Sequence, residues 1–512
     1  KNRKGNKIIM EKQIKTALVS VFSKDGLSPI IELLNKNGVK IISTGGTADF
    51  IRKMNVPVTE VEELTGFPAI FDGRVKTLQP TIFGGILKIR GNAVHEEEAK
   101  KHNVPEIDLV IVDLYPFEET LAKGGTPEEI IEKIDIGGIS LIRAAAKNFN
   151  DVVIVPSKNQ YEYVKNILDP EGKITSNGVI GTILEQRKYL AGCAFEVTSM
   201  YDTAIRGYFQ GSTLRYGENP HQSGAFIGDL SKAFDILQGK ELSYNNLLDA
   251  DAAIRLIKDF PMPAFAILKH TNACGCATGD GGTLELLKKA YTTDPVSAFG
   301  GILVTNQKVD ADVAKFLVEE VKLFFEILIA PEFTKEALEI LAKKVDIRVL
   351  ALHEFEMPIK EIRTCLTGML IQDRDSEIDG VNNFTTVTKR APTEQELNDM
   401  VIGATIAKHL KSNCVVIVKD GNMITMGAGQ VSRVDALKNS LEKAKGFGLD
   451  VKGGILASEA FLPFPDCVEI SGMAGVTAVV QPGGSKKDQL SIDKCDELGM
   501  AMVTTGFRHF KH

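Results

Sequence analysis

TALVSVF, residues 16–22, is a short β-rich run that ends in front of a polar, helix-like stretch. The same rhythm returns in VKIIS (39–43), DLVIVDL (108–114) and DVVIVP (151–156), with helical patterns between the runs. Strands that alternate with helices in this way predict a parallel α/β sheet for the first two hundred residues. Residues that bind a ligand are then expected at the carboxyl ends of these strands.

A domain boundary is predicted near residues 200–212, where a helical stretch gives way to the loop-like GSTLRYGENPHQSG (211–224). Beyond it the alternation resumes, with buried strands predicted at AFAILKH (264–270), FGGILVT (299–305), NCVVIVKD (413–420) and GVTAVVQP (475–482). Two α/β halves of similar construction would fill residues 212–512.

The composition is that of a globular protein, since 44% of the 512 residues are hydrophobic and 25% are charged. A formal net charge of -7 argues against general electrostatic binding to nucleic acid or to an anionic membrane. No apolar run reaches the roughly 18 residues that span a bilayer. Seven scattered cysteines favour a reducing, cytoplasmic setting. Residues 1–11 are interpreted as an extension or tag-like segment, with Met10 as a candidate start.

Two segments of the first part have the character of phosphate-binding loops. STGGT (43–47) lies between a strand and a helical pattern, where free backbone N–H groups could hold a phosphate, although a plain tight turn is the commoner explanation. GFPAIFDGRVKTLQPTIFGGIL (66–87) then brings Arg74, Lys76 and Thr77 together within four residues of an irregular segment. These residue types indicate a second phosphate clamp.

IDIGGISLIRAAAKN (134–148) and DLYPF (113–117) supply further candidates. Asp135 precedes a predicted helix, on which Arg143 and Lys147 are four residues apart and share a face. A capped helix with solvated cations is the alternative, but the small AAA between the cations favours close packing with a charged edge. Tyr115 ends a strand at the ligand-binding edge, where a tyrosine is as often part of the core.

The sharpest chemical pair of the second part is Lys269 and His270, which end a buried strand and precede the polar segment TNACGCATGDGG (271–282). A neutral imidazole beside an ammonium group can remove a proton while the cation stabilises developing negative charge, although a lone histidine there is usually structural. Cys274 and Cys276 lack zinc-site spacing. KSN (411–413), GAGQVSR (427–433) and PGGSKKD (482–488) are interpreted as loops that approach a ligand.

In their order these motifs resemble a bifunctional family that joins an aminoimidazole carboxamide ribonucleotide (AICAR) transformylase to an inosine monophosphate (IMP) cyclohydrolase. In the first part the resemblance rests on STGGT, TGFPAIFDGRVKTL, DLYPF and IDIGGISLIRAAAKN. In the second it rests on LRYGENPHQ, GKELSYNNLLDADAA, KHTNACG, DPVSAFGGI, KSN, GAGQVSR, AFLPFPD, QPGGS and TGFRHFKH. These motifs span nearly the whole chain from about Thr16 onward.

The resemblance implies a cyclohydrolase domain over residues 12–200, similar in fold to methylglyoxal synthase. It implies a transformylase domain over residues 201–512, built from two subdomains similar to cytidine deaminase without its zinc, at approximately 212–375 and 376–512. The implied function is formyl transfer from 10-formyltetrahydrofolate to AICAR, followed by ring closure to IMP. The folate is a cosubstrate, no redox or metal cofactor is implied, and members are typically homodimers.

Residue roles follow from the matched motifs. For the transformylase, His270 matches the base, Lys269 its assisting cation and Asn413 the residue that orients the carboxamide. The other matches in that region are Arg215, Tyr216 and Arg508 for the nucleotide and Phe299, Phe461 and Asp466 for the folate. For the cyclohydrolase, the matches are Lys76, Tyr115, Asp135 and Lys147 in catalysis, and Lys24, Ser43, Thr44, Gly45, Gly46, Thr47, Arg74 and Thr77 around phosphate and ribose.

Some positions depart from the family pattern. An S-x-S-D-K motif is usual near the start, whereas this chain has Ser20-Val21-Phe22-Ser23-Lys24 followed by Asp25. Gln79 and Phe83 stand where many relatives carry histidine, and Ala273 replaces a common proline. Two other functions therefore stay open at this point: a protein that retains only one activity, and a nucleotide-binding protein that has lost both.

Overall fold

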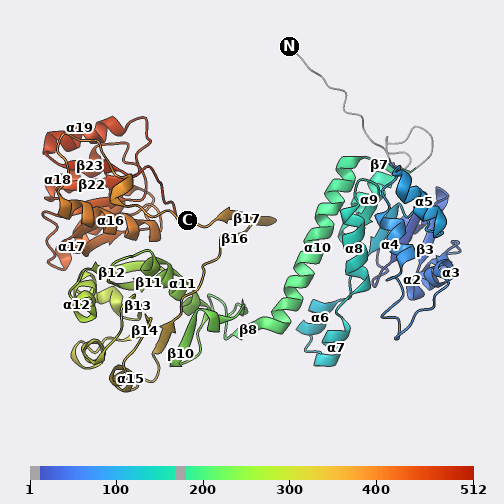
Figure 1. Ribbon diagram of the computed structural model, residues 1–512, viewed down its shortest axis with the longest axis horizontal. Helices are drawn as coiled ribbons and strands as arrows, with labels where there is room; N and C mark the ends of the chain where they lie inside the picture. Colours follow the sequence, from blue (N-terminus) through green and yellow to red (C-terminus); the bar gives the residue numbers. More distant parts are fainter. Residues whose placement is uncertain (1–11, 169–179) are drawn as a thin grey trace, which may run out of the picture. The chain divides into compact units, whose positions relative to one another are not determined.

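The structure, a computed structural model, describes residues 12–168 and 180–512, so the predicted extension at 1–11 lies outside the described residues. The chain divides into two compact units, Lys1–Gly211 and Ser212–His512 (Figure 1). Helix α10 (Leu184–Gln210) closes the first unit and runs through residue 200, the position at which the resemblance places the domain boundary. Among the described residues, no helix has the length and apolar character needed to cross a membrane.

The first unit contains a five-stranded parallel sheet in the order β4-β3-β2-β5-β6. Its strands are β2 (Thr16–Ser20), β3 (Lys40–Ser43), β4 (Thr59–Glu60), β5 (Leu109–Val112) and β6 (Val153–Val155). The four predicted strands are confirmed. The edge strand β4 was not predicted, because two half-buried residues carry no apolar run.

Helices cover this sheet, and α2 and α8 begin near its ligand-binding edge. They are α1 (Ser28–Lys36), α2 (Gly45–Lys53), α3 (Val61–Thr65), α4 (Pro80–Leu87), α5 (Ala93–Lys101), α6 (Phe117–Ala122), α7 (Pro127–Glu132), α8 (Gly137–Lys147) and α9 (Tyr161–Leu168). Apolar side chains of β2, β3 and β5 are fully buried between the layers, for example Leu18, Ile42 and Ile111. This rigid core fixes the strand ends that carry the site.

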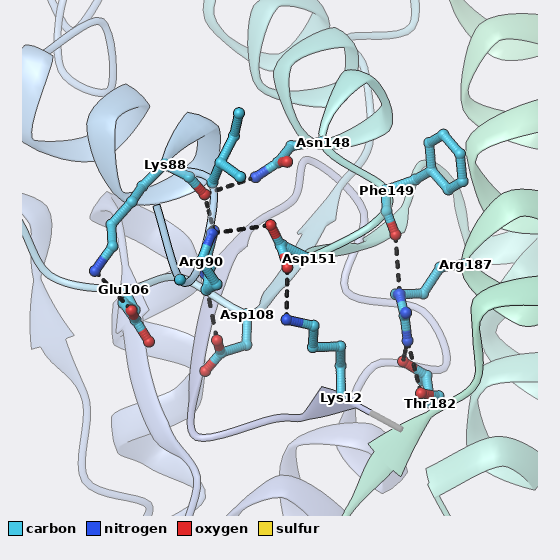
Figure 2. Close-up of polar contacts among 12 residues, drawn as sticks. Lys12, Lys88, Arg90, Glu106, Asp108, Asn148, Phe149, Asp151, Thr182 and Arg187 are labelled. Carbon is cyan, nitrogen blue, oxygen red and sulfur yellow. Dashed lines mark hydrogen bonds and ion pairs between the residues drawn. The ribbon is translucent and has the colours of Figure 1, made fainter. Parts of the chain in front are cut away.

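A charged network links strands and loops of the first unit (Figure 2). The backbone N–H of Arg90 donates to Asp151, which also pairs with Lys12 at 2.6 Å. The Arg90 guanidinium lies 3.7 Å from Asp108, whose carboxylate accepts from the N–H of Thr16 at the start of β2. Because Asp108 precedes β5 and Thr16 begins β2, the network lies at the amino ends of the strands. It stabilises the sheet at the edge opposite the predicted ligand site.

Arg187 joins helix α10 to this unit from a fully buried position (Figure 2). Its Nε donates to the Phe149 carbonyl at 2.9 Å and its Nη1 to the Thr182 carbonyl at 2.6 Å. Replacing Arg187 by methionine leaves these buried carbonyls without donors, so we expect the free energy of unfolding to fall by about 3 kcal/mol. The change is measured by urea unfolding of the first unit. The neighbouring Lys188→Met variant, altered at an exposed position, should be nearly neutral.

The second unit is organised around a twelve-stranded sheet in the order β10-β15-β14-β13-β11-β12-β20-β19-β21-β22-β23-β18. The first half contributes β10 (Phe234–Gln238), β11 (Ala264–Lys269), β12 (Asn272–Thr278), β13 (Gly301–Thr305), β14 (Phe325–Ala330) and β15 (Arg348–Leu352). The second half contributes β18 (Thr385–Thr386), β19 (Val415–Lys419), β20 (Asn422–Gly427), β21 (Ile455–Ser458), β22 (Ala478–Gln481) and β23 (Ala501–Thr504).

The two halves mirror each other across the junction of β12 and β20. Each has an antiparallel hairpin at the junction, followed by three mutually parallel strands and an antiparallel edge strand. The amide of Thr278 donates to the Gly421 carbonyl at 2.8 Å and joins the halves into one sheet. The expectation of two similar α/β halves is therefore confirmed by the strand order.

Helices of the second unit follow the same duplication. The first half has α11 (Tyr244–Lys258), α12 (Thr283–Thr293), α13 (Pro295–Ala298), α14 (Ala311–Lys315) and α15 (Lys335–Leu341). The second has α16 (Glu394–His409), α17 (Arg433–Gly446), α18 (Asp466–Met473) and α19 (Asp488–Leu498). Two small hairpins, β8 (Gly211–Leu214) with β9 (Gly224–Ile227) and β16 (Lys360–Cys365) with β17 (Gly368–Asp373), lie outside the large sheet.

One strand of this unit was not predicted. TNACGCATGDGG, described from the sequence as a polar segment, contains the buried central strand β12. Small residues are required there because helix α12 packs closely, and a Cβ on Gly275 would lie 2.1 Å from the Ala290 carbonyl oxygen. Glycine and alanine in this strand therefore reflect close packing rather than a loop.

Candidate functional site

A cavity of about 480 Å³ opens at the carboxyl ends of β2, β3 and β5 in the first unit. Its lining combines cations, hydroxyls, four carboxylates and two aromatic rings, a set suited to a phosphorylated polar ligand. Of the predicted site residues, it includes Lys24, Thr44, Gly46, Thr47, Arg74, Lys76, Thr77, Tyr115 and Asp135. The sheet topology thus brings together side chains that are far apart in the sequence.

The STGGT segment passes from β3 into helix α2, as the sequence predicted. Thr44 lies at the helix N-cap and its hydroxyl is 3.0 Å from that of Ser20, while Thr47 donates to the Val21 carbonyl at 2.9 Å. Ser43 donates to the Val19 carbonyl at 2.7 Å and does not line the cavity, and neither does Gly45. The hydroxyls therefore fix the loop, and the backbone N–H groups at the start of α2 remain available to an anion.

Three cations reach the cavity from two loops. Lys24 Nζ donates to the carbonyls of Val21 and Phe22 at 2.7 and 3.0 Å, and burial lowers the pKa of this ammonium although Asp113 opposes the shift. Arg74 pairs with Glu132. Lys76 makes no hydrogen bond or ion pair within the described part of the chain, so its ammonium group is available to a ligand.

Asp135 lies at the N-terminus of α8, where the Gly138 amide donates to its carboxylate at 2.5 Å. Burial raises the pKa of this carboxyl despite its amide hydrogen bonds. A Cβ on Gly138 would lie 2.8 Å from Asp135 Oδ2, which explains why glycine stands there. From α10, the Tyr201 hydroxyl accepts from the Asp135 amide at 2.8 Å and donates to the Lys133 carbonyl at 2.5 Å. Asp135 is therefore held in place from two elements.

Tyr115 and Asp113 follow β5 and face the loop after β2. The Tyr115 ring packs edge-on against Phe22 at 5.8 Å, and burial raises the pKa of its hydroxyl. Asp113 accepts from the amides of Phe22 and Ser23 and so fixes the loop that departs from the family pattern. Asp113 was not among the predicted site residues, although its position at the end of a strand could have identified it as one. Asp25 is exposed, outside the cavity lining, and pairs with Lys158.

Besides Ser43 and Gly45, the predicted residue that does not line this cavity in the single chain is Lys147. It is the last residue of α8, about 15 Å along the helix axis from Gly137, which does line the cavity. Arg143, on the same exposed face, stacks over Phe195 of α10 at 5.7 Å. Of the positions that depart from the family pattern, Gln79 occupies the N-cap position of α4 without a side-chain capping bond, and Phe83 packs against the core.

In the second unit, Lys269 and His270 lie at the turn that joins β11 to β12. Lys269 Nζ donates to the Phe299 carbonyl at 2.5 Å, and the His270 side chain is exposed. The turn also contacts the KSN loop of the other half, because the Lys411 amide donates to the Asn272 side chain at 3.1 Å. The predicted base and the loop that carries Asn413 are therefore neighbours.

Asn413 is held by residues that were not among the predicted site residues. Its Oδ1 accepts from Arg433 Nη2 at 3.0 Å, and its Nδ2 donates to the Gln430 carbonyl at 3.1 Å. Arg433 in turn pairs with Glu459, whose side chain is fully buried. Arg433 lies in GAGQVSR, a segment already interpreted as a loop that approaches a ligand, whereas no sequence motif indicated Glu459. The buried pair sets the direction of the Asn413 amide.

The remaining predicted residues of the second unit lie on other segments than the His270 turn and the KSN loop. Arg215 stacks over Tyr216 at 4.7 Å, and their loop contacts α11 through a 3.1 Å bond from Asn245 to the Glu218 carbonyl. Arg508 is exposed on the C-terminal segment, which runs beside Ser412 through backbone bonds of Lys511. Phe299 is exposed beside Lys269, whereas Phe461 and Asp466 follow β21, at the end that carries Glu459.

The two cysteines of β12 have structural roles. Cys274 and Cys276 are buried, and burial raises the pKa of each thiol to about 12. Both are therefore protonated at neutral pH. Within residues 12–168 and 180–512, no group of three or more His, Cys, Asp and Glu side chains is arranged to hold a metal ion.

Comparison with known proteins covers nearly the whole chain. Residues 145–443 match the family described as "AICARFT/IMPCHase bienzyme", and residues 26–140 match the "MGS-like domain". The "Bifunctional purine biosynthesis protein PurH" of Bacteroides thetaiotaomicron is 52% identical over 98% of this chain and 99% of its own length. The proteins of the same name from Aquifex aeolicus and Rhodospirillum rubrum are 44% and 45% identical, over 97% and 98% of this chain and 100% and 99% of their own lengths.

Proposed function

Because the chain belongs to the AICARFT/IMPCHase bienzyme family of bifunctional purine biosynthesis enzymes, we propose that its two compact units divide the last two steps of that pathway. The family's activities are formyl transfer to AICAR and closure of the formylated product to IMP. The first unit is assigned the cyclohydrolase and the second the transformylase. The observation that supports this assignment is that two differently built sets of predicted site residues lie in separate units, one around the cavity of the first unit and one around the His270 turn of the second.

The cyclohydrolase assignment is supported by the cavity at the ends of β2, β3 and β5. The amides of α2 with Lys24 and Arg74 suit the phosphate and ribose. Ring closure forms a bond between the carboxamide nitrogen and the formyl carbon, and the formyl oxygen leaves as water. The chain must therefore mainly hold a folded substrate and move protons, roles that fit Asp135, Tyr115 and Lys76. Lys147 remains a predicted participant, although it lies outside this cavity in the single chain.

The transformylase assignment is supported by the His270 turn and the adjoining KSN loop. The AICAR amine attacks the formyl carbon of 10-formyltetrahydrofolate, and the bond from that carbon to the folate nitrogen breaks. His270 accepts the amine proton, Lys269 stabilises the tetrahedral intermediate, and Asn413 orients the carboxamide. Arg215, Tyr216 and Arg508 are assigned to the nucleotide, and Phe299, Phe461 and Asp466 to the folate. We also propose a folate as the formyl donor and a cytoplasmic location. Free thiols at all seven cysteines agree with a cytoplasmic location.

A homodimer is also proposed, supported by the β16–β17 hairpin. This two-stranded ribbon exposes Ile362, Ile371 and Met369 on one face, and an isolated hairpin is only marginally stable in water. We expect Ile371→Lys to shift the protein from dimer toward monomer by more than about tenfold in dissociation constant. Light scattering during gel filtration measures the mass. Gln372→Lys, on the opposite face of the same strand, should leave the dimer intact, and equal effects of both changes would contradict this interface.

The experiment that tests the proposed function follows products of the purified protein supplied with AICAR and 10-formyltetrahydrofolate. Formation of IMP is expected, with the formylated ribonucleotide as a transient intermediate. Accumulation of that intermediate would mean that only the transformylase survives in this chain. Absence of any turnover would indicate a nucleotide-binding protein that has lost both activities.

A further inference from the structure

The turn between β11 and β12 has a strained backbone. Its two central residues, His270 and Thr271, have φ values of 50° and 64°. Two-residue hairpin turns of this kind favour Asn, Asp and Gly, because other side chains crowd the backbone in the left-handed region. A β-branched residue such as Thr271 is among the least suited to it. Contacts outside the turn must therefore hold this conformation.

The second half of the unit contains the same turn without the strain. There β19 and β20 are joined by Asp420 and Gly421, with φ values of 52° and 74°. Lys419 and Asn422 flank this turn as Lys269 and Asn272 flank the first. Since the duplicated fold accepts the favoured Asp-Gly pair, the hairpin itself does not require His270 and Thr271. We therefore connect the strained backbone with the proposed role of the His270 side chain as the base.

A carboxylate from the preceding helix anchors each turn. Asp249 of α11 accepts from the Thr271 amide at 2.7 Å. At the matching place in α16, Asp399 accepts from the amides of Asp420 and Gly421 at 3.0 and 2.8 Å. The first turn thus has one anchoring bond where the second has two, although the first is the one under strain.

Asp249 is a partly buried carboxyl that faces the active turn. Burial raises its pKa, and the hydrogen bond from the Thr271 amide and the charge of Lys269 oppose that shift. Glu326 of β14 is the acidic neighbour, and its charge is taken up by Arg348 of β15 at 2.7 Å.

We propose that Asp249 is a positioning residue for formyl transfer: by holding the Thr271 amide it keeps the strained turn closed and aims the His270 imidazole at the AICAR amine. The inference rests on the proposed role of His270. It adds a residue that touches neither substrate and acts only through the turn.

The test compares Asp249→Ala with Asp399→Ala in the full chain, by steady-state kinetics with AICAR and 10-formyltetrahydrofolate. We expect Asp249→Ala to lower kcat on the order of 100-fold with little change in KM for AICAR, because a small misplacement of a catalytic group has effects of that size. Asp399→Ala should stay within about threefold of wild type, because an Asp-Gly turn needs less support. Urea unfolding followed by circular dichroism reports that the second unit of each variant is folded, and the cyclohydrolase rate, measured with the formylated ribonucleotide, reports the same for the first unit.

Two further variants separate positioning from charge and from general structure. Thr271→Gly removes the strain, so adding it to Asp249→Ala should restore at least about tenfold of the lost kcat. Asp249→Asn keeps an acceptor for the Thr271 amide and should lose less than Asp249→Ala. Equal losses from Asp249→Ala and Asp399→Ala, or no recovery with Thr271→Gly, would overturn the inference. An inactive wild-type protein would instead contradict the proposed function.

Discussion

Replacing His270 by asparagine is expected to lower the transformylase kcat on the order of 1,000-fold, because a positioned general base contributes roughly 100-fold to 10,000-fold. Asparagine is the suitable replacement, since it tolerates the positive φ of 50° at this position better than most residues. The turn and the neighbouring loop should therefore keep their structure while the imidazole is lost. The measurement is single-turnover formyl transfer at saturating AICAR and folate.

The same variant should close the formylated ribonucleotide to IMP at the wild-type rate, because the cyclohydrolase cavity is formed entirely by residues of the first unit. His353→Asn serves as the matched control, since this histidine lies in the same unit but bonds to Ser231 and Asp235 away from the turn. Loss of both activities from His270→Asn would contradict the assignment of two separate sites. Retention of formyl transfer would remove His270 as the base.

Replacing Asp135 by asparagine should lower the cyclohydrolase rate on the order of 100-fold, since it removes a positioned proton acceptor. An asparagine oxygen can still accept the Gly138 amide, so the N-terminus of α8 should keep its structure. The formylated ribonucleotide is then expected to accumulate during turnover from AICAR, because formyl transfer in the second unit continues. Chromatography of the reaction mixture over time measures the intermediate and IMP together.

Asp25→Asn is the control for this experiment, because Asp25 is exposed and lies outside the cavity lining. It also tests the first loop, in which the acidic residue stands after Lys24 instead of before it. We expect wild-type cyclisation from this control, since Asp113 supplies the carboxylate that fixes the loop amides. If Asp25→Asn slowed cyclisation as much as Asp135→Asn, the displaced acid and not Asp135 would be the critical carboxylate.

Much of this molecule could be predicted from local sequence, because its signals are short in range. The runs from TALVSVF to DVVIVP became the parallel strands β2, β3, β5 and β6, since apolar β-branched runs between helices suit a sheet covered on both faces. STGGT likewise passes from a strand into a helix start. The bifunctional assignment followed from ordered motifs, and the family comparisons agree with it.

Contacts between distant segments could not be predicted in this way. The segment after His270 was described only as polar and no strand was predicted there, yet its small residues allow close packing against α12 and it forms the central strand β12. Arg433 and Glu459 were not selected, because their importance comes from a buried pair beside Asn413 that no local pattern reveals.

Local sequence specified the apolar strands β2, β3, β5 and β6, the start of α2 and the residue types available for chemistry, because these depend on neighbours along the chain. Which of those residues meet depends on the tertiary fold. It gathered Lys24, Lys76 and Asp135 around one cavity and left Lys147 outside it, since a side chain's surroundings depend on sheet order and helix direction. It also placed the strained His270 turn and its relaxed copy, the Asp420–Gly421 turn, at opposite ends of β12, a relation that appears only when the two halves are compared in space.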